Sequence, residues 1–317
     1  MKSQTDEERN AQRRTTMYDA IVIGAGPAGL QAALTLGRMH RSTLLLDSGE
    51  YRNGTVLHMH NMVGVDGTPP AEFRATARTE LAAYDDVEVR ETAATSIAGV
   101  EDAFVVAVAD GSMAEGRRVV LATGVADDLP VIPGLQQLWG TLAFSCPFCD
   151  GHEHADKDIA IIGAAPRAEH LIGLLGRIVA SITVVPVGEA FTDEDIRTLE
   201  AKGARVSRTP VASVEKVDGG VRIRTDDDER VVAGVFVAAG AMRQRSPFSA
   251  QLDVDMLESG CIEIDEFGRT SHAGVFAAGD LAHRATLPGP MASVLLAAAA
   301  GQLAAVGIIQ SLLAAEH

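Results

Sequence analysis

Short apolar runs that end in glycine turns recur along the chain. Residues 18–36, YDAIVIGAGPAGLQAALTL, begin with such a run, pass through closely spaced glycines and continue into a second apolar stretch. An uninterrupted apolar run of a few residues is typical of a buried parallel strand. We therefore predict strand, tight turn and helix here, and a second strand over residues 42–47, STLLLD.

The same order returns in the second half of the chain. Residues 158–175, DIAIIGAAPRAEHLIGLL, again predict strand, turn and helix, and residues 181–191 predict the next strand with its exit loop. Further strands are predicted within 231–244, leading to a crossover, and within 273–282. Two strand–turn–helix units in 317 residues indicate two Rossmann-like domains of ordinary size.

A long apolar run near the C-terminus, residues 291–314, has the length of a membrane span. Small residues dominate it, and the polar residues Ser293, Gln302, Gln310 and Ser311 are spaced along it. This pattern favours a helix buried inside a domain or at a dimer interface. We therefore expect no membrane association.

Composition and charge narrow the expected partners and compartment. Apolar residues make up 47% of the chain and the formal net charge is −16, so nucleic acid, whose backbone is also negative, is not an expected partner. The first sixteen residues are polar and lack the apolar core of a secretory signal, and residues 1–13 are predicted to form a disordered tail. Three cysteines are too few for a disulfide scaffold, so we expect a cytoplasmic protein.

The first glycine turn has the spacing of a dinucleotide site. Gly24, Gly26 and Gly29 form G-x-G-x-x-G between a predicted strand and helix. In this motif the first glycine permits the turn, the second lets a pyrophosphate approach, and the third lets the helix pack on the strand. Asp47 ends the next strand, where a carboxylate holds an adenosine ribose. The alternative is a glycine turn in a ligand-free α/β unit.

The second glycine turn is altered at two of the three positions. Gly163 keeps the first glycine, but Ala165 and Ala168 occupy the places of the second and third. Backbone approach by a pyrophosphate is therefore less favourable here than in the first motif.

Cys146 and Cys149 stand two residues apart in FSCPFCDGHE, and three interpretations are open. The pair could bind zinc together with His152 and His154, although these ligands crowd the geometry of a four-ligand site. It could be an inert buried pair. It could be a redox pair, because C-x-x-C cysteines close a small ring and a thiol near a helix N-terminus has a lowered pKa. Cys261 has no partner in the sequence and is interpreted as a packed core residue.

The order of these motifs resembles a known family. GAGPAG, the triplet Ala122-Thr123-Gly124, C-P-F-C-D-G and the later FAAGD follow one another as in the low-molecular-weight thioredoxin reductases, which are FAD flavoproteins. The resemblance implies an α/β fold with two Rossmann-like, three-layer domains. An FAD-binding domain, residues 14–124 and 243–317, would be split around an inserted NAD(P)-type domain, residues 125–242, that carries the cysteine pair. It also implies a homodimer.

The resemblance also implies which residues contact FAD. Asn61 lies in HNMVG, which matches the family's E-N-x-P-G segment, with His60 and Val63 in place of the glutamate and proline. Ser293 and Val294 occupy the positions of a flavin-facing Gln-Ala pair. The complete implied set is Gly24, Gly26, Pro27, Ala28, Gly29, Asp47, Arg52, Asn61, Ala122, Thr123, Gly124, Gly279, Asp280, Ser293 and Val294. No metal is implied.

For the chemistry, the resemblance gives three residues a role. Cys149 would face the flavin, and Cys146 would exchange with the substrate sulfur through a mixed disulfide. Asp150 would act as acid and base beside Cys149. The histidines of the loop 54–60, His58 and His60, are more simply ordinary loop residues than catalytic bases. Residues 54–60 and 283–291 are the candidate substrate loops, from their position alone.

One departure from the family bears on the direction of electron flow. The reductases hold the 2′-phosphate of NADPH with arginines after the second strand of the inserted domain, whereas residues 184–195, VVPVGEAFTDED, have none and carry four acids instead. Like charges repel a 2′-phosphate. The pattern resembles the branch of dithiol oxidases that close disulfides in natural products such as gliotoxin and holomycin. That branch commonly has histidine after the second cysteine, where this chain has Asp150.

Three functions remain open at this stage. The first is an FAD-dependent oxidase of a small dithiol, with O2 as acceptor and H2O2 as product. The second is a disulfide reductase for thioredoxin or a similar protein, driven by NAD(P)H, ferredoxin or another donor. The third is a non-enzymatic flavoprotein that senses redox state through the cysteine pair.

Overall fold

A computed structural model describes residues 17–316, and the predicted tail at 1–13 lies outside these residues. Its residues form two compact units. Unit 1 contains the chain up to Arg52, then Ala71–Ala126, and the chain from Arg243 onward. Unit 2 contains Asn53–Pro70 and Asp127–Met242. The segment 53–70, which the sequence analysis placed in the split domain, therefore belongs to unit 2 in the structure.

Unit 1 is built on a mixed sheet. Its elements are β1 (Tyr18–Ile23), α2 (Pro27–Arg38), β2 (Thr43–Leu46), α3 (Pro70–Leu81), β3 (Val87–Arg90), β4 (Ala94–Val100), β5 (Ala103–Val108), β6 (Met113–Leu121), α8 (Phe248–Gln251), β17 (Ile262–Glu263), β18 (Val275–Ala277), β19 (Ala282–His283) and α9 (Val294–Ala315). The strand order is β3-β2-β1-β6-β5-β4, and β18 also pairs with β6. β1, β2, β3, β6 and β18 run parallel, whereas β4 and β5 are antiparallel additions.

The parallel pairing brings three strand ends to one edge of the sheet. Ile23 at the end of β1 pairs with Leu121 at the end of β6, and Leu121 pairs with Ala277 at the end of β18. The residues that follow these strands include Gly24, the triplet 122–124 and Gly279. In open α/β sheets, ligands bind outside the carboxyl ends of the strands. This edge is therefore the place to look for the cofactor.

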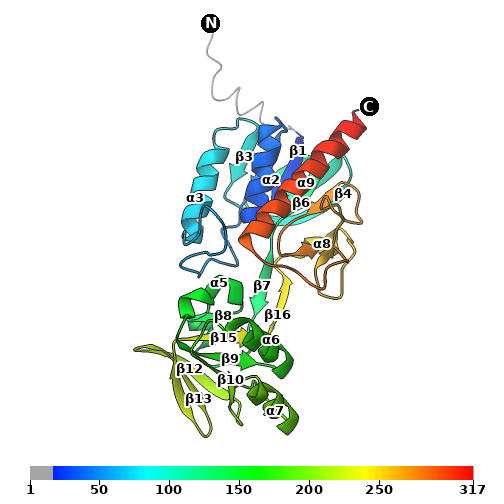
Figure 1. The fold of residues 1–317 in the computed structure, drawn as a ribbon. Helices are drawn as coiled ribbons and strands as arrows, with labels where there is room; N and C mark the ends of the chain where they lie inside the picture. The colour runs from blue at the N-terminus through cyan, green and yellow to red at the C-terminus, as the bar shows by residue number, and fades with distance from the viewer. Residues whose placement is uncertain (1–16, 317) are drawn as a thin grey trace. The chain divides into compact units, whose positions relative to one another are not determined.

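The C-terminal apolar run forms α9, which packs beside α2 in unit 1 (Figure 1). Within the described residues it is the one helix long and apolar enough to cross a membrane. Its small residues allow close approach, and a Cβ at Gly301 would lie 2.0 Å from the carbonyl oxygen of Ala28. The buried Arg118 of β6 donates from Nε to Ser311 Oγ at 2.8 Å. One face of α9 is thus part of a protein core, in accord with the buried helix predicted from the sequence.

Unit 2 has a parallel sheet of five strands in the order β11-β10-β9-β15-β8. Its elements are α4 (Leu135–Leu138), β8 (Ala143–Phe144), α5 (Pro147–Asp150), the 3₁₀ helix η1 (His152–His154), β9 (Asp158–Gly163), α6 (Ala165–Leu175), β10 (Ser181–Val185), α7 (Asp193–Ala201), β11 (Arg205–Val206), β12 (Val211–Val217), β13 (Gly220–Thr225), β14 (Glu229–Val232) and β15 (Gly234–Ala238). The paired strands β7 (Val125–Asp128) and β16 (Ala241–Gln244) lie where the chain passes between the units.

Three layers make up unit 2. On one face of the parallel sheet, α6 and α7 supply Leu171, Leu175 and Leu199 to a core with strand residues such as Ile161. On the other face, the antiparallel sheet β12-β13-β14 supplies its own apolar residues, including Ile223. The parallel sheets in both units confirm the predicted α/β fold with two Rossmann-like domains.

Candidate functional site

The glycine turn after β1 is shaped by close backbone contacts. Gly24 has φ +108°, and a Cβ there would lie 2.4 Å from the carbonyl oxygen of Ala122. A Cβ at Gly29 would lie 1.8 Å from the carbonyl oxygen of Gly24. Both positions therefore require glycine so that α2 can pack against the end of β1.

At Gly26, by contrast, the described residues themselves do not require glycine. Its φ of −73° suits any residue, and no heavy atom of the described residues outside its own neighbours lies within 4 Å of a Cβ built there. Gly26 is the N-cap of α2, Pro27 is the first helical residue, and the first turn 27–30 carries no acidic side chain. The open space thus lies at a helix N-terminus whose N–H groups and dipole favour an anion. These features fit the pyrophosphate of FAD.

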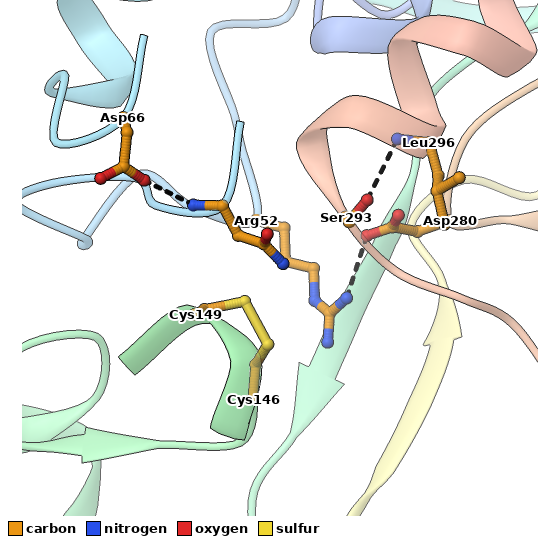
Figure 2. The surroundings of a disulfide bond; sticks show 8 residues. Arg52, Asp66, Cys146, Cys149, Asp280, Ser293 and Leu296 are labelled. Carbon is orange, nitrogen blue, oxygen red and sulfur yellow. Dashed lines mark hydrogen bonds and ion pairs between the residues drawn. A yellow bond between two sulfur atoms is a disulfide. The ribbon is translucent and has the colours of Figure 1, made fainter. Parts of the chain in front are cut away.

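The other predicted residues of unit 1 gather around the ends of β6 and β18. Thr123 Oγ1 lies 3.0 Å from Ser246 Oγ. Arg52 Nη1 donates to Asp280 Oδ2 at 2.9 Å (Figure 2). Ser293 caps α9, because its Oγ accepts the N–H of Leu296 at 3.0 Å (Figure 2). The polar side chains expected to meet the cofactor are thus already positioned by hydrogen bonds inside the unit.

Asp47 lies at the centre of a network that the sequence analysis did not find. Its Oδ1 accepts the N–H of Gly49 at 2.9 Å, and its Oδ2 accepts the hydroxyl of Tyr51 at 2.6 Å. Arg78 of α3 donates from Nη2 to the same Oδ2 and, at 2.6 Å, to the Tyr51 hydroxyl. The guanidinium carbon of Arg74 lies 3.8 Å from the centre of the Tyr51 ring. The helical spacing of the two arginines, four residues apart, was the available signal.

The network keeps Asp47 ionised. Burial alone would raise the pKa of this carboxyl, but the hydrogen bonds from Tyr51, Gly49 and Arg78 outweigh it and hold the pKa below its usual range. Burial, with the carboxylate of Asp47 beside it, raises the pKa of Tyr51 to about 12. A carboxylate has about four lone-pair sites, so Asp47 retains acceptor capacity for a ribose hydroxyl.

Asn61 is the one predicted cofactor residue that the structure places in unit 2. It is exposed, has φ +65°, and its N–H donates to Asp66 Oδ1 at 2.7 Å. The hydrogen bond therefore stabilises a turn in the segment 53–70. Its contact with FAD remains a prediction from the resemblance.

Cys146 and Cys149 form a disulfide at the start of α5 (Figure 2). Cys146 is the N-cap of this one-turn helix, and its carbonyl accepts the N–H of Asp150 at 3.2 Å. Both cysteines are half-buried, so reagents can reach them. His154 is buried instead, with its ring against Phe144 and Phe236. The described residues contain no group of three or more His, Cys, Asp or Glu placed to hold a metal.

Asp150, next to Cys149, is held in a state from which it can exchange a proton near neutral pH. Burial raises the pKa of its carboxyl, the negative charge of Glu153 raises it further, and His60 opposes them, so that the pKa is about 6. A general acid or base works best when its pKa lies near the working pH. This property fits the role that the resemblance gives to Asp150.

The second glycine motif keeps the backbone turn of the first motif but lacks the open space that a phosphate would need at the start of the helix. A Cβ at Gly163 would lie 2.3 Å from the carbonyl of Ala238, so the first glycine is still required. At the next helix, α6, Ala165 is the first residue, so a methyl group stands at the position that Gly26 leaves open in the first motif.

The turn after β10 is negative. Thr192 and Asp195 form a capping box at the start of α7, and Asp193 and Glu194 complete an acidic first turn. Arg208 Nη1 lies 4.0 Å from Asp193 Oδ1, and both side chains are exposed. Carboxylates at a helix N-terminus stabilise the helix, and they occupy the place where an anionic ligand would be held.

Cys261 is a free, buried cysteine, as the sequence analysis interpreted it. Burial raises the pKa of its thiol. A thiol held protonated is a poor nucleophile, so Cys261 is a packing residue.

Comparison with known proteins agrees with this geometry. Residues 18–303 match the family described as pyridine nucleotide-disulphide oxidoreductase. Thioredoxin reductase tcpT from Claviceps purpurea is 31% identical over 94% of this chain and 96% of its own length. An oxidoreductase from Agrobacterium tumefaciens has a TM-score of 0.85 at 33% identity, over 94% of this chain and 99% of that chain. The structure of HlmI has a TM-score of 0.84 at 32% identity, over 94% of this chain and 93% of that chain.

These matches cover almost all of the described residues, and they confirm the resemblance and the cofactor inferred from the motifs. The chain belongs to the pyridine nucleotide-disulphide oxidoreductase family and is an FAD-binding, thioredoxin-reductase-like disulfide oxidoreductase.

Proposed function

We propose that the protein is a dithiol oxidase that forms a disulfide in a small dithiol substrate and passes the electrons to O2. One observation carries the proposal. The glycine turn of unit 1 leaves open space at Gly26. The corresponding turn of unit 2 carries the methyl group of Ala165. In addition, the first turn of α7, which follows the next strand of unit 2, is acidic. A protein with a flavin site and a redox disulfide, but no favourable site for the 2′-phosphate of NADPH, suits electron input from the thiol side.

The exchange at the cysteine pair proceeds in two balanced steps. A substrate thiolate attacks Cys146 Sγ, the Cys146–Cys149 bond breaks, and Cys149 leaves as a thiolate. The second substrate thiol then attacks the substrate sulfur of the mixed disulfide and releases Cys146. The substrate has lost two electrons and two protons, and the pair has become a dithiol. The carboxyl of Asp150 is placed to take and return a proton beside Cys149.

FAD, when bound, would accept the two electrons from the reduced pair and deliver them to O2, giving H2O2. Gly26 and the N-terminus of α2 would hold its pyrophosphate, and Asp47 would hold its adenosine ribose. The network of Tyr51, Arg74 and Arg78 would keep Asp47 ionised for that contact.

Oxygen consumption tests the proposal directly. The purified flavoprotein, mixed with dithiothreitol in air, should consume O2 and release an equal amount of H2O2. Cys149→Ser should abolish flavin reduction, whereas Cys146→Ser should block exchange with substrate. Rapid bleaching of the flavin by NADPH, with no O2 uptake from dithiol, would contradict the proposal.

A second candidate is a disulfide reductase for a thioredoxin-like protein, driven by NADH, ferredoxin or another donor. Asp150 supports it, because this residue matches the reductases rather than the oxidase branch. Anaerobic titration with NADH, NADPH and reduced ferredoxin distinguishes the two functions. Reduction of the flavin by one of these donors, but not by dithiol, would favour the reductase.

We also propose a homodimer in a reducing, cytoplasmic compartment. Leu295, Leu296, Leu303 and Leu313 of α9 are between 43% and 49% exposed, and they leave an apolar face opposite the core. Apolar faces of this kind mark contact with another protein. Sedimentation velocity should show a dimer, and Leu303→Glu should shift it toward monomer.

A further inference from the structure

Two acidic side chains lie around one histidine next to α5, the helix that carries Cys149. In unit 2, His60 Nε2 lies 3.5 Å from Glu153 Oε1, and His60 Nδ1 lies 3.6 Å from Asp66 Oδ2. Glu153 belongs to η1, directly after α5, whereas His60 and Asp66 belong to the segment 53–70. The imidazole therefore joins two carboxylates from parts of the chain that are far apart in the sequence.

The segment 53–70 holds His60 by its own backbone. Met59 and Thr68 form an isolated bridge, with the N–H of Met59 donating to the Thr68 carbonyl at 2.9 Å. The Oδ1 of Asp66 accepts the N–H of Asn61 at 2.7 Å, which leaves Oδ2 on the side of His60. The position of the imidazole thus follows from a closed turn.

The main chain at Glu153 is held in place by the next residue, His154. The Nδ1–H of His154 donates to the main-chain carbonyl of Asp150 at 2.8 Å, and the His154 ring is fixed between Phe144 and Phe236. This contact ties η1 to the end of α5. Glu153 is therefore kept close to Asp150 and to His60 together.

The two side chains act on Asp150 with opposite signs. Glu153 raises the pKa of Asp150 and His60 lowers it, beyond the larger effect of burial. The helix α6 also packs against α5, and its charged groups are engaged elsewhere, because Arg167 donates to the Gly240 carbonyl and Glu169 pairs with Lys202. His170 of α6 and His152 of η1 are exposed.

We propose that His60 and Glu153 are positioning residues that set, in opposite directions, the proton occupancy of Asp150 and with it the pH range of thiol exchange at Cys149. The inference rests on the role given to Asp150 in the proposed function. When a substrate thiol attacks Cys146, its proton passes to the carboxylate of Asp150, and the acid form returns that proton to the Cys149 thiolate. A carboxyl that is always protonated or always ionised performs only one half of this cycle.

Opposite shifts of a pH profile test the proposal. The rate of anaerobic flavin reduction by dithiothreitol is measured from pH 5 to 8 in wild type, Glu153→Gln and His60→Gln. Glu153→Gln removes a negative charge and should move the inflection of the rate–pH curve to lower pH. His60→Gln removes the imidazole and should move the same inflection to higher pH. A shift of about half a unit corresponds to a change of roughly threefold in the ratio of acid to carboxylate. Glu200→Gln, an exposed change of the same charge on α7, should leave the inflection in place.

A second measurement does not depend on turnover. Infrared difference spectra between wild type and Asp150→Asn report the carboxylic-acid band of Asp150, and its titration is followed in the two variants. If the Asp150 band titrates at the same pH in Glu153→Gln, His60→Gln and wild type, the inference is overturned, even if the protein oxidises dithiols rapidly. Opposite shifts of the band in a protein that consumes no O2 would support the inference while contradicting the proposed function.

Discussion

Replacing Gly26 with alanine should separate cofactor binding from folding. The Gly26 backbone has φ −73° and ψ −177°, which alanine adopts without strain. No heavy atom of the described residues beyond its neighbours lies within 4 Å of the added methyl. The methyl would instead stand in the open space at the N-terminus of α2, where the pyrophosphate of FAD is expected. The corresponding residue of unit 2 is Ala165.

The expected magnitudes follow from these contacts. Glycine is a better N-cap than alanine, so the apoprotein should lose about 1 kcal/mol of unfolding free energy or less. Displacing the pyrophosphate should cost at least one charge-assisted hydrogen bond, which is worth about 1.5–3 kcal/mol. That loss corresponds to roughly a 10- to 150-fold rise in Kd for FAD.

Gly29→Ala is the matched control. It adds the same methyl group three residues later, but there the Cβ would lie 1.8 Å from the carbonyl oxygen of Gly24. The helix must move to accept it, and overpacking of this kind costs about 1–3 kcal/mol or more. Gly29→Ala should therefore lower the stability of the apoprotein, and its FAD affinity should fall as a consequence.

Two assays on the apoprotein distinguish these effects. Kd for FAD is obtained from the quenching of flavin fluorescence, and stability from the urea midpoint without cofactor, because bound FAD would itself raise the midpoint. The reasoning is refuted by a Gly26→Ala protein that binds FAD as tightly as wild type. It is equally refuted by one that loses as much apoprotein stability as Gly29→Ala.

Three further predictions concern titrating groups. The fold raises the pKa of Asp150 from 3.8 to about 6, so its ionisation destabilises the folded protein as pH rises through this range. Asp150→Asn should remove that loss of unfolding free energy, which is about 1–2 kcal/mol after solvent screening. The melting temperatures of wild type and Asp150→Asn should therefore differ at pH 8 and agree at pH 4. Arg78→Met should raise the pKa of Asp47 and weaken FAD binding about tenfold, equivalent to about 1.4 kcal/mol. The rise in Kd should be larger at pH 5 than at pH 8, and equal Kd ratios at both pH values would contradict this. Cys261→Ser should change turnover less than twofold, and a thiol reagent should label Cys261 only after unfolding.

The parts of the site that depend on local sequence could be predicted. Gly24, Gly29 and Asp47 are recognisable because a strand, a tight turn and a helix follow one another along the chain, and each of these residues has a defined place in that unit. Gly279 came from the family resemblance, and it lies just after the strand predicted within 273–282. The sheet then brings these strand ends together, as parallel pairing requires.

Contacts between distant segments could not be predicted. Arg78 reaches Asp47 from α3, 31 residues further along the chain, and nothing in the residues around Asp47 indicates it. His60 was interpreted as an ordinary loop histidine, because its contact with Glu153 depends on how the segment 53–70 packs in unit 2. The antiparallel strands β4 and β5 were also missed; AFVVAV of β5 is apolar throughout, so its alternating burial cannot be read from the sequence.

The pairing of α2 with α9 has a consequence for the order of events during synthesis. Unit 1 is completed only by the residues from Arg243 onward, whereas unit 2 is complete at Met242. Domains generally fold as units while the chain emerges from the ribosome. The nascent chain must therefore carry an uncovered α2 through the synthesis of all of unit 2, and loading of FAD has to wait for the last helix. A chain that stops before Val294 should keep a folded unit 2, bind no flavin and aggregate through the exposed apolar face of α2.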